Sequence, residues 1–184
     1  ILMLSKYLKK NKYDFIKLRE PGGNINSEKI RKLILNKKSN FDKITDLLLY
    51  LAARNENMKE YKRFYNKKII LIDRFTDSTI AYQHYGLGVN FDIIKKVNDF
   101  ILKDFKVDFT FLNTVSLKNM ILRLKSRKSL NRYDNFDLKF YSRVQKGFIK
   151  LANKNKTKYK LIDSNLDINF NSEEIIKTIH KIIK

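Results

Sequence analysis

The sequence of 184 residues contains no cysteine, no tryptophan and a single proline. Without cysteine, neither a disulfide bond nor a thiolate metal site can form, which excludes a disulfide-stabilised secreted module. Long apolar runs are also missing, because the longest aliphatic stretch covers only residues 69–72, whereas about 20 apolar residues are needed to cross a bilayer. Lysines follow the apolar start at once and no small-residue cleavage site is evident, so we expect a cytoplasmic protein with no membrane partner.

The composition is that of a folded, basic protein. Hydrophobic residues make up 43% and aromatic residues 12%, which predicts a globular chain, and the length predicts one domain over residues 1–184. The formal net charge is +21, which raises the alternative of a nucleic-acid-binding module. However, 31 of the 40 cationic residues are lysines, and their excess is spread along the chain. We therefore interpret the charge as a solvated lysine surface and expect no nucleic-acid partner.

Apolar patterning predicts strands that alternate with helices. The strands are expected at residues 13–18, 68–72, 109–112 and 160–162. The helices are expected at residues 1–10, 27–35, 44–65, 78–85, 91–103, 117–125, 136–154 and 172–183. This alternation indicates an α/β fold built on a parallel sheet.

Charged or polar residues follow three of the predicted strands. Arg19-Glu20 comes after the first, Asp73-Arg74 after the second and Asp163-Ser164 after the last. Ligands of parallel α/β sheets bind at the carboxyl ends of the strands, so these residues suggest one pocket for an anionic, metal-associated ligand. The alternative is that Asp73 and Arg74 only cap the next helix and pair with their neighbours.

Several motifs in this order resemble those of the bacterial thymidylate kinases. They are Arg-Glu-Pro-Gly-Gly at 19–23, Leu-Leu-Tyr-Leu-Ala-Ala-Arg at 48–54 and the segment 73–83, followed by 127–132 and 140–148. The resemblance covers essentially the whole chain and implies a three-layer fold of the P-loop nucleoside monophosphate kinase type. It also implies phosphorylation of dTMP to dTDP with ATP and Mg²⁺, in dTTP synthesis, by a homodimer.

The resemblance assigns the residues that hold phosphate and metal. Arg74, Arg19 and Arg31 match arginines that bind the acceptor phosphate, and the planar guanidinium suits a bidentate contact with phosphate. Asp73 and Glu20 match acids that organise Mg²⁺ and its waters. A surface position for Arg31 and a structural pairing of Glu20 with Arg19 are the alternatives.

Residues of two predicted helices are implied to bind the thymidine. Tyr50 stands where the family usually has a phenylalanine that stacks on thymine, and Arg54, one helical turn later, matches the residue that bonds the carbonyl edge. Tyr82 matches the tyrosine that crowds the deoxyribose. The other implied contacts are Ser78, Thr79 and Gln83. Packing in the core is the alternative for both tyrosines.

The segment 123–135 resembles the family's lid, which closes over ATP. Arg123, Arg127 and Arg132 are the expected catalytic arginines, and Arg143 matches a recurrent family arginine. Lys128 and Asn131 depart from the usual glycine and aspartate. Asp163 and Ser164 are expected near adenine.

The family's first strand and its P-loop, a glycine-rich loop ending in Gly-Lys-Ser/Thr, have no counterpart in the 184 residues. We hypothesise an amino-terminal truncation that leaves the sheet without its first, central strand, so that this chain binds ATP weakly and does not turn over. Two alternatives remain: a catalytically dead nucleotide-binding or basic nucleic-acid-binding module, and a kinase for another deoxynucleoside monophosphate.

Overall fold

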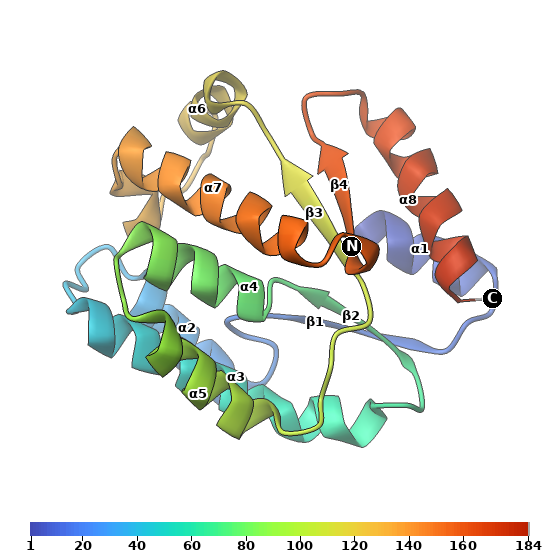
Figure 1. Cartoon of the computed structure of the whole chain (residues 1–184), viewed down its shortest axis with the longest axis horizontal. Helices are drawn as coiled ribbons and strands as arrows, with labels where there is room; N and C mark the ends of the chain where they lie inside the picture. The colour runs from blue at the N-terminus through green and yellow to red at the C-terminus, as the bar shows by residue number, and fades with distance from the viewer. Residues whose placement is uncertain (184) are drawn as a thin grey trace.

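The computed structural model describes residues 1–183, and Figure 1 shows helices and strands in alternation along the chain. The four strands are β1 (Phe15–Arg19), β2 (Ile69–Asp73), β3 (Thr110–Thr114) and β4 (Tyr159–Asp163). All four predicted strands are therefore confirmed to within two residues at each end. Short apolar runs between polar loops were sufficient to locate them.

The strands pair in parallel, but in two separate sheets (Figure 1). β1 pairs with β2 in the register Phe15 with Ile69, and β3 pairs with β4 in the register Thr110 with Tyr159. The parallel α/β class is thus confirmed. The strands form two pairs because no strand within residues 1–183 joins β2 to β3 by hydrogen bonds, which agrees with the expectation of a parallel sheet that lacks its central strand.

The helices enclose both strand pairs. They are α1 (Leu2–Lys10), α2 (Ile25–Leu35), α3 (Lys43–Phe64), α4 (Thr76–Thr79), α5 (Phe91–Leu102), α6 (Leu117–Lys125), α7 (Leu138–Lys154) and α8 (Ile168–Ile182). Shorter helical segments are η1 (Ile80–Gly86), η2 (Arg132–Asn135) and η3 (Lys156–Lys158). No helix within residues 1–183 is long and apolar enough to span a membrane.

Helix starts follow side-chain caps that the sequence only partly revealed. α2 starts at Ile25, two residues before the predicted start, because the Asn24 side chain caps it by accepting a hydrogen bond from the Ser27 amide. α8 starts at Ile168 for the same reason, with Asp167 as its cap. The predicted helix over 78–85 is in fact α4 followed by a π-helix, η1, a form that is rare and often found at functional sites.

Three apolar clusters hold these elements together. One joins α3 and α5 around Tyr61, and a second joins α2, η1 and α7 around Phe140. The third joins α1 and α8 to both strand pairs, because Leu71 of β2 and Phe111 of β3 pack in it together. The second cluster packs η1 against α7 and α3, and these three elements carry many of the residues of the site described next.

Candidate active site

Two cavities open at the carboxyl ends of the strands. The larger, about 1040 Å³, is lined by Arg19, Asp73, Arg123 and Ser164 among others. The smaller is about 260 Å³. Of the predicted residues, it is lined by Glu20, Arg31, Tyr50, Arg54, Arg74, Ser78, Thr79, Tyr82, Gln83 and Arg127. The last residues of β1 and β2, Arg19 and Asp73, therefore line the larger cavity, whereas the residues that follow them, Glu20 and Arg74, line the smaller one.

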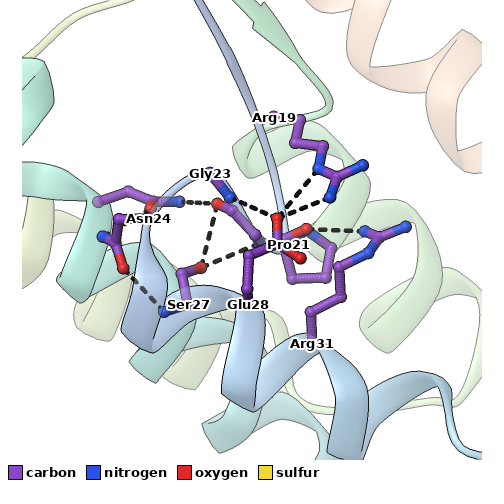
Figure 2. A network of polar contacts seen from close by, with 9 residues as sticks. Arg19, Pro21, Gly23, Asn24, Ser27, Glu28 and Arg31 are labelled. Carbon is purple, nitrogen blue, oxygen red and sulfur yellow. Dashed lines mark hydrogen bonds and ion pairs between the residues drawn. The ribbon is translucent and has the colours of Figure 1, made fainter.

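The loop after β1 is fixed by one carboxylate oxygen (Figure 2). Glu28 Oε1 accepts hydrogen bonds from Arg19 Nε at 3.2 Å, Arg19 NH2 at 2.7 Å and the Gly23 amide at 2.9 Å. The Arg19 hydrogen bond and the Gly23 amide lower the pKa of Glu28. Gly22 and Gly23 have φ angles of +113° and +108°, and a Cβ on Gly22 would lie 2.4 Å from Glu28 Oε1. The glycine pair is therefore required for this turn.

Arginines gather at the mouth of the smaller cavity. Arg31 reaches back from α2 and donates to the Pro21 carbonyl at 2.7 Å (Figure 2). Burial and the positive charges of Arg19 and Arg74 lower the pKa of Arg31. The Arg74 guanidinium carbon lies 5.4 Å from the centre of the Tyr82 ring, and Arg74 forms no ion pair within residues 1–183. This excess positive charge suits an anionic group.

Arg54 is buried beneath the cavity and is held on every guanidinium nitrogen. Its Nε donates to Glu20 Oε2 at 2.8 Å, NH2 donates to Thr79 Oγ1 at 3.0 Å and NH1 donates to Asn98 Oδ1. Tyr61 donates to the other Glu20 oxygen at 2.9 Å. Arg54 and Thr79 therefore line the cavity as parts of a rigid buried network, in which Asn98 is a member that the sequence did not reveal.

The same network bears on Glu20 and Asp73, the two residues expected to organise Mg²⁺. Burial raises the pKa of Glu20, although Arg54 opposes this, and both carboxylate oxygens of Glu20 already accept hydrogen bonds. Asp73 is exposed and lines the larger cavity, whereas Glu20 lines the smaller one. No cluster of three His, Cys, Asp or Glu side chains suited to a metal exists within residues 1–183.

Three of the aromatic residues that line the smaller cavity pack against one another. Tyr133 of η2 packs edge-on against Tyr50 and Tyr82, with ring centroids 6.1 Å and 5.8 Å away. Burial raises the pKa of Tyr50 to about 12, so its hydroxyl stays protonated at neutral pH. Tyr50 and Tyr82 thus belong both to the cavity and to a packed apolar cluster, and Tyr133 is a lining residue that sequence reasoning missed.

A buried aspartate that the sequence analysis also missed lies behind the tyrosines. Asp46, in the first turn of α3, accepts hydrogen bonds from Tyr133 Oη, Arg132 NH2 and, at 3.3 Å, Gln83 Nε2. A lone acid directly before the apolar run 47–51 was its only sequence signal. Arg132, an expected catalytic arginine, also donates to the Ile34 carbonyl and does not line either cavity.

The remaining lid residues divide between the cavities. Arg127 pairs with Asp134 at 2.6 Å and lines the smaller cavity. Arg123 donates to the Ser164 carbonyl at 2.6 Å and lines the larger one, whereas Asp163 bonds Asn165 nearby. Arg143 donates to the Gly86 carbonyl at 3.0 Å, which fastens the end of η1.

Comparison with known proteins shows the family of the chain. A family model described as thymidylate kinase matches residues 1–175. The chain belongs to the thymidylate kinase family. It is 34% identical over 186 residues to a thymidylate kinase of Sulfurihydrogenibium sp., covering 100% of this chain and 86% of that protein. It is 39% identical over 168 residues to one of Ehrlichia ruminantium (strain Gardel), covering 90% and 80% of the two chains.

A solved structure supports the fold directly. The crystal structure of thymidylate kinase from Ehrlichia chaffeensis superposes with a TM-score of 0.76 at 34% identity, covering 97% of this chain and 88% of that one. The thymidylate kinase family consists of nucleoside monophosphate kinases that use ATP as phosphoryl donor.

Proposed function

We propose that the protein transfers the γ-phosphoryl group of ATP to the 5′-phosphate of dTMP, in the cytoplasm and in the course of dTTP synthesis. The observation that carries this proposal is the lining of the smaller cavity, which combines arginines, tyrosine rings and one glutamine amide. A nucleotide monophosphate has the matching parts: an anionic phosphate, an apolar sugar face and a base with a polar edge.

The acceptor nucleotide is held by side chains that line the smaller cavity. Arg74 and Arg31 bind the 5′-phosphate, since Arg74 has no acidic partner within residues 1–183 and Arg31 already lies under repulsion from its neighbours. Tyr82, whose ring lies 5.4 Å from the Arg74 guanidinium, borders the deoxyribose, and Tyr50 stacks on the base. Ser78 also lines this cavity, and Thr79 fixes Arg54 in its wall.

The donor nucleotide is assigned to the larger cavity. Arg19 and Arg123 line it and supply positive charge for the ATP phosphates. Ser164 borders the adenine, and Asp163, which accepts a hydrogen bond from Asn165, lies beside Ser164 in the chain. Asp73 faces this cavity while Arg74, the next residue, faces the other, so the two nucleotides' phosphates meet at the end of β2. Phosphoryl transfer needs such in-line positioning above all.

Charge that develops during transfer is stabilised by arginines that flank both cavities. Arg127 and Arg123 are the catalytic candidates because each lines one cavity. Arg132 acts by holding the lid segment on α3 through Asp46 and the Ile34 carbonyl. Mg²⁺, when bound, neutralises phosphate charge; Asp73 offers it an exposed carboxylate, and Glu20 supports Arg54 rather than the ion.

We also propose a homodimer. Apolar side chains that no other described element covers lie on α3 and α5, with Leu48 56% exposed, Ile93 49% exposed and Phe100 76% exposed. Exposed apolar area of this kind marks interaction surfaces. Sedimentation velocity is expected to give twice the mass of the 22.0 kDa chain, and replacement of Phe100 by glutamate is expected to give the monomer.

Titration calorimetry with dTMP tests the acceptor assignment, because described residues alone build that cavity. We expect dTMP to bind and dAMP and dGMP to bind at least tenfold more weakly, since a purine presents a different shape and a different polar edge to the tyrosines and to Gln83 with the phosphate on Arg74. Turnover is measured by coupled ADP release with ATP and Mg²⁺, using the chain and a version with a P-loop strand fused ahead of Ile1. Equal binding of all monophosphates would contradict the assignment.

A further inference from the structure

One buried polar atom of a residue that lines the smaller cavity has no partner among residues 1–183. The residue is Gln83, which is 1% exposed. Its Nε2 donates to Asp46 Oδ2 at 3.3 Å, whereas its Oε1 is buried and accepts no hydrogen bond from the described residues. A buried carbonyl oxygen without a donor costs about 1–3 kcal/mol, so Oε1 is available to a ligand that brings a donor.

Asp46 determines which end of the Gln83 amide remains available. A carboxylate only accepts hydrogen bonds, and Asp46 accepts them from Gln83, Arg132 and Tyr133 together. Reversing the amide would set Gln83 Oε1 against a charged oxygen and would break one of these bonds. The orientation with Nε2 on Asp46 is therefore the only one in which the two side chains form a hydrogen bond.

The surroundings make this orientation rigid. Asp46 is 2% exposed and Tyr133 is 6% exposed, so water does not compete for the carboxylate. Two of the three donors, on Arg132 and Tyr133, come from η2 in the lid segment, whereas Asp46 is in α3 and Gln83 is in η1. Three separate elements therefore converge on the carboxylate that holds the Gln83 amide.

We propose that Asp46 is a positioning residue for base selection. By holding Gln83 Nε2, it leaves Oε1 as the atom that Gln83 presents to the base, so the cavity selects a base that has an N–H at ring position 3. Thymine and uracil have this donor, whereas cytosine has a lone pair there. The inference rests on the proposed function, because it takes the smaller cavity as the site of the acceptor nucleotide.

The Asp46→Asn variant tests the proposal, with Asp99→Asn as the matched control on an exposed helix position. An asparagine keeps its oxygen toward Arg132, which can only donate, and so turns its NH2 toward Tyr133 and Gln83. The Tyr133 hydroxyl accepts by rotating its proton, whereas the Gln83 amide must turn its Oε1 toward position 46 to avoid two facing NH2 groups. Calorimetry with dTMP, dUMP and dCMP is expected to show a preference for dTMP over dCMP that falls at least tenfold in Asp46→Asn. We expect dUMP to follow dTMP, and Asp99→Asn to retain the original preference.

The outcomes separate the inference from the proposed function. If the unaltered chain binds none of the three nucleotides, the proposed function fails and the inference fails with it. If Asp46→Asn weakens all three equally while the unaltered chain selects dTMP, the function stands and the inference is overturned. An unchanged preference in Asp46→Asn overturns it as well.

A second measurement uses the unaltered chain and so does not depend on the folding of a variant. The sequence has two glutamines, Gln83 and Gln145, so labelling glutamine with ¹³Cδ and ¹⁵Nε gives two side-chain amide signals in NMR spectra. Addition of dTMP is expected to shift the Gln83 Cδ signal, because Oε1 gains a donor, while its Nε2 proton signals keep their positions on Asp46. Movement of the Nε2 protons with an unmoved Cδ signal would overturn the proposal.

Discussion

Arg54 Nε donates to Glu20 Oε2 at 2.8 Å, and the two side chains are 2% and 5% exposed. This ion pair joins the middle of α3 to the loop after β1, directly below the smaller cavity. A charge left unpaired in such a place is expensive, whereas a satisfied pair is rigid. The relationship therefore explains how the cavity floor keeps its shape without a ligand.

Replacing Arg54 by methionine is expected to lower the free energy of unfolding by about 3–5 kcal/mol, because it leaves the Glu20 carboxylate buried and unpaired. The double variant with Glu20→Gln is expected to recover part of this loss, since the amide carries no charge. Urea denaturation measures both. Arg63→Met, the same change at an exposed position of α3, is the control and is expected to cost little; an equal cost at both positions would contradict a special role for the pair.

The sequence located this pair's residues but not their relationship. Arg54 and Glu20 were both predicted site residues, one for the base and one for the metal, yet they bond to each other across 34 residues of sequence. Strand positions follow from local apolar runs, and the cavities follow from the parallel strand ends, so both were predictable. Partners of buried charges depend on tertiary packing, for which a single sequence has no local signal.

The same distinction applies to Asp46 and to η1. Asp46 looks like an ordinary polar residue in the first turn of a helix, and only the fold brings Gln83 and Tyr133 to it. The composition of 78–85 predicts a helix, but its π form depends on close packing against α7, where Gly86 and Gly147 lie at the contact. The separation of the strands into two pairs, in contrast, agrees with the expectation of a sheet that lacks its central strand.

Gly147→Ala is expected to destabilise the protein by about 1–3 kcal/mol, although alanine normally favours a helix over glycine by about 1 kcal/mol. A Cβ on residue 147 of α7 would lie 2.5 Å from the Tyr85 ring and 2.8 Å from Tyr85 Cβ. Rotation of the Tyr85 side chain would not relieve the second contact, because Tyr85 Cβ is fixed to the backbone. Because η1 carries Tyr82 and Gln83, the affinity for dTMP should fall as well.

Thermal denaturation and dTMP calorimetry on Gly147→Ala check this prediction. Gly88→Ala serves as the control, because no atom lies within 4 Å of a Cβ there and the φ of +74° alone costs about 1–2 kcal/mol. If Gly147→Ala raised the stability as it would in an exposed helix, the close packing of α7 on η1 would be disproved.

Asp77 and Glu28 should change the free energy of unfolding in opposite directions as the pH falls. Burial raises the pKa of Asp77, although the Tyr159 hydroxyl and Arg54 partly oppose this. The folded state then binds the proton more readily than the unfolded state, so the contribution of Asp77 grows as the pH falls. The pKa of Glu28 is lowered by Arg19 and the Gly23 amide, so its contribution is present near neutral pH and is lost as the pH falls.

Urea denaturation at pH 7 and at acidic pH separates these contributions. The difference in the free energy of unfolding between the unaltered chain and a variant cancels the contribution of every carboxyl group that the two share. Relative to Asp77→Asn, the unaltered chain is expected to gain stability on acidification. Relative to Glu28→Gln, it is expected to lose stability over the same interval. The same sign for both comparisons would contradict the environments described for these two carboxyl groups.

Arg74 and Arg123 should affect dTMP binding very differently, because they line different cavities. Arg74→Met removes a guanidinium that has no acidic partner within residues 1–183, so we expect dTMP to bind about 10- to 100-fold more weakly, as for a lost hydrogen bond to a charged group. Arg123→Met, the same change beside the Ser164 carbonyl, is expected to leave the affinity almost unchanged. Calorimetry compares the two variants directly. Comparable losses would mean that one nucleotide spans both cavities, which would reverse the assignment of donor and acceptor sites argued from the end of β2.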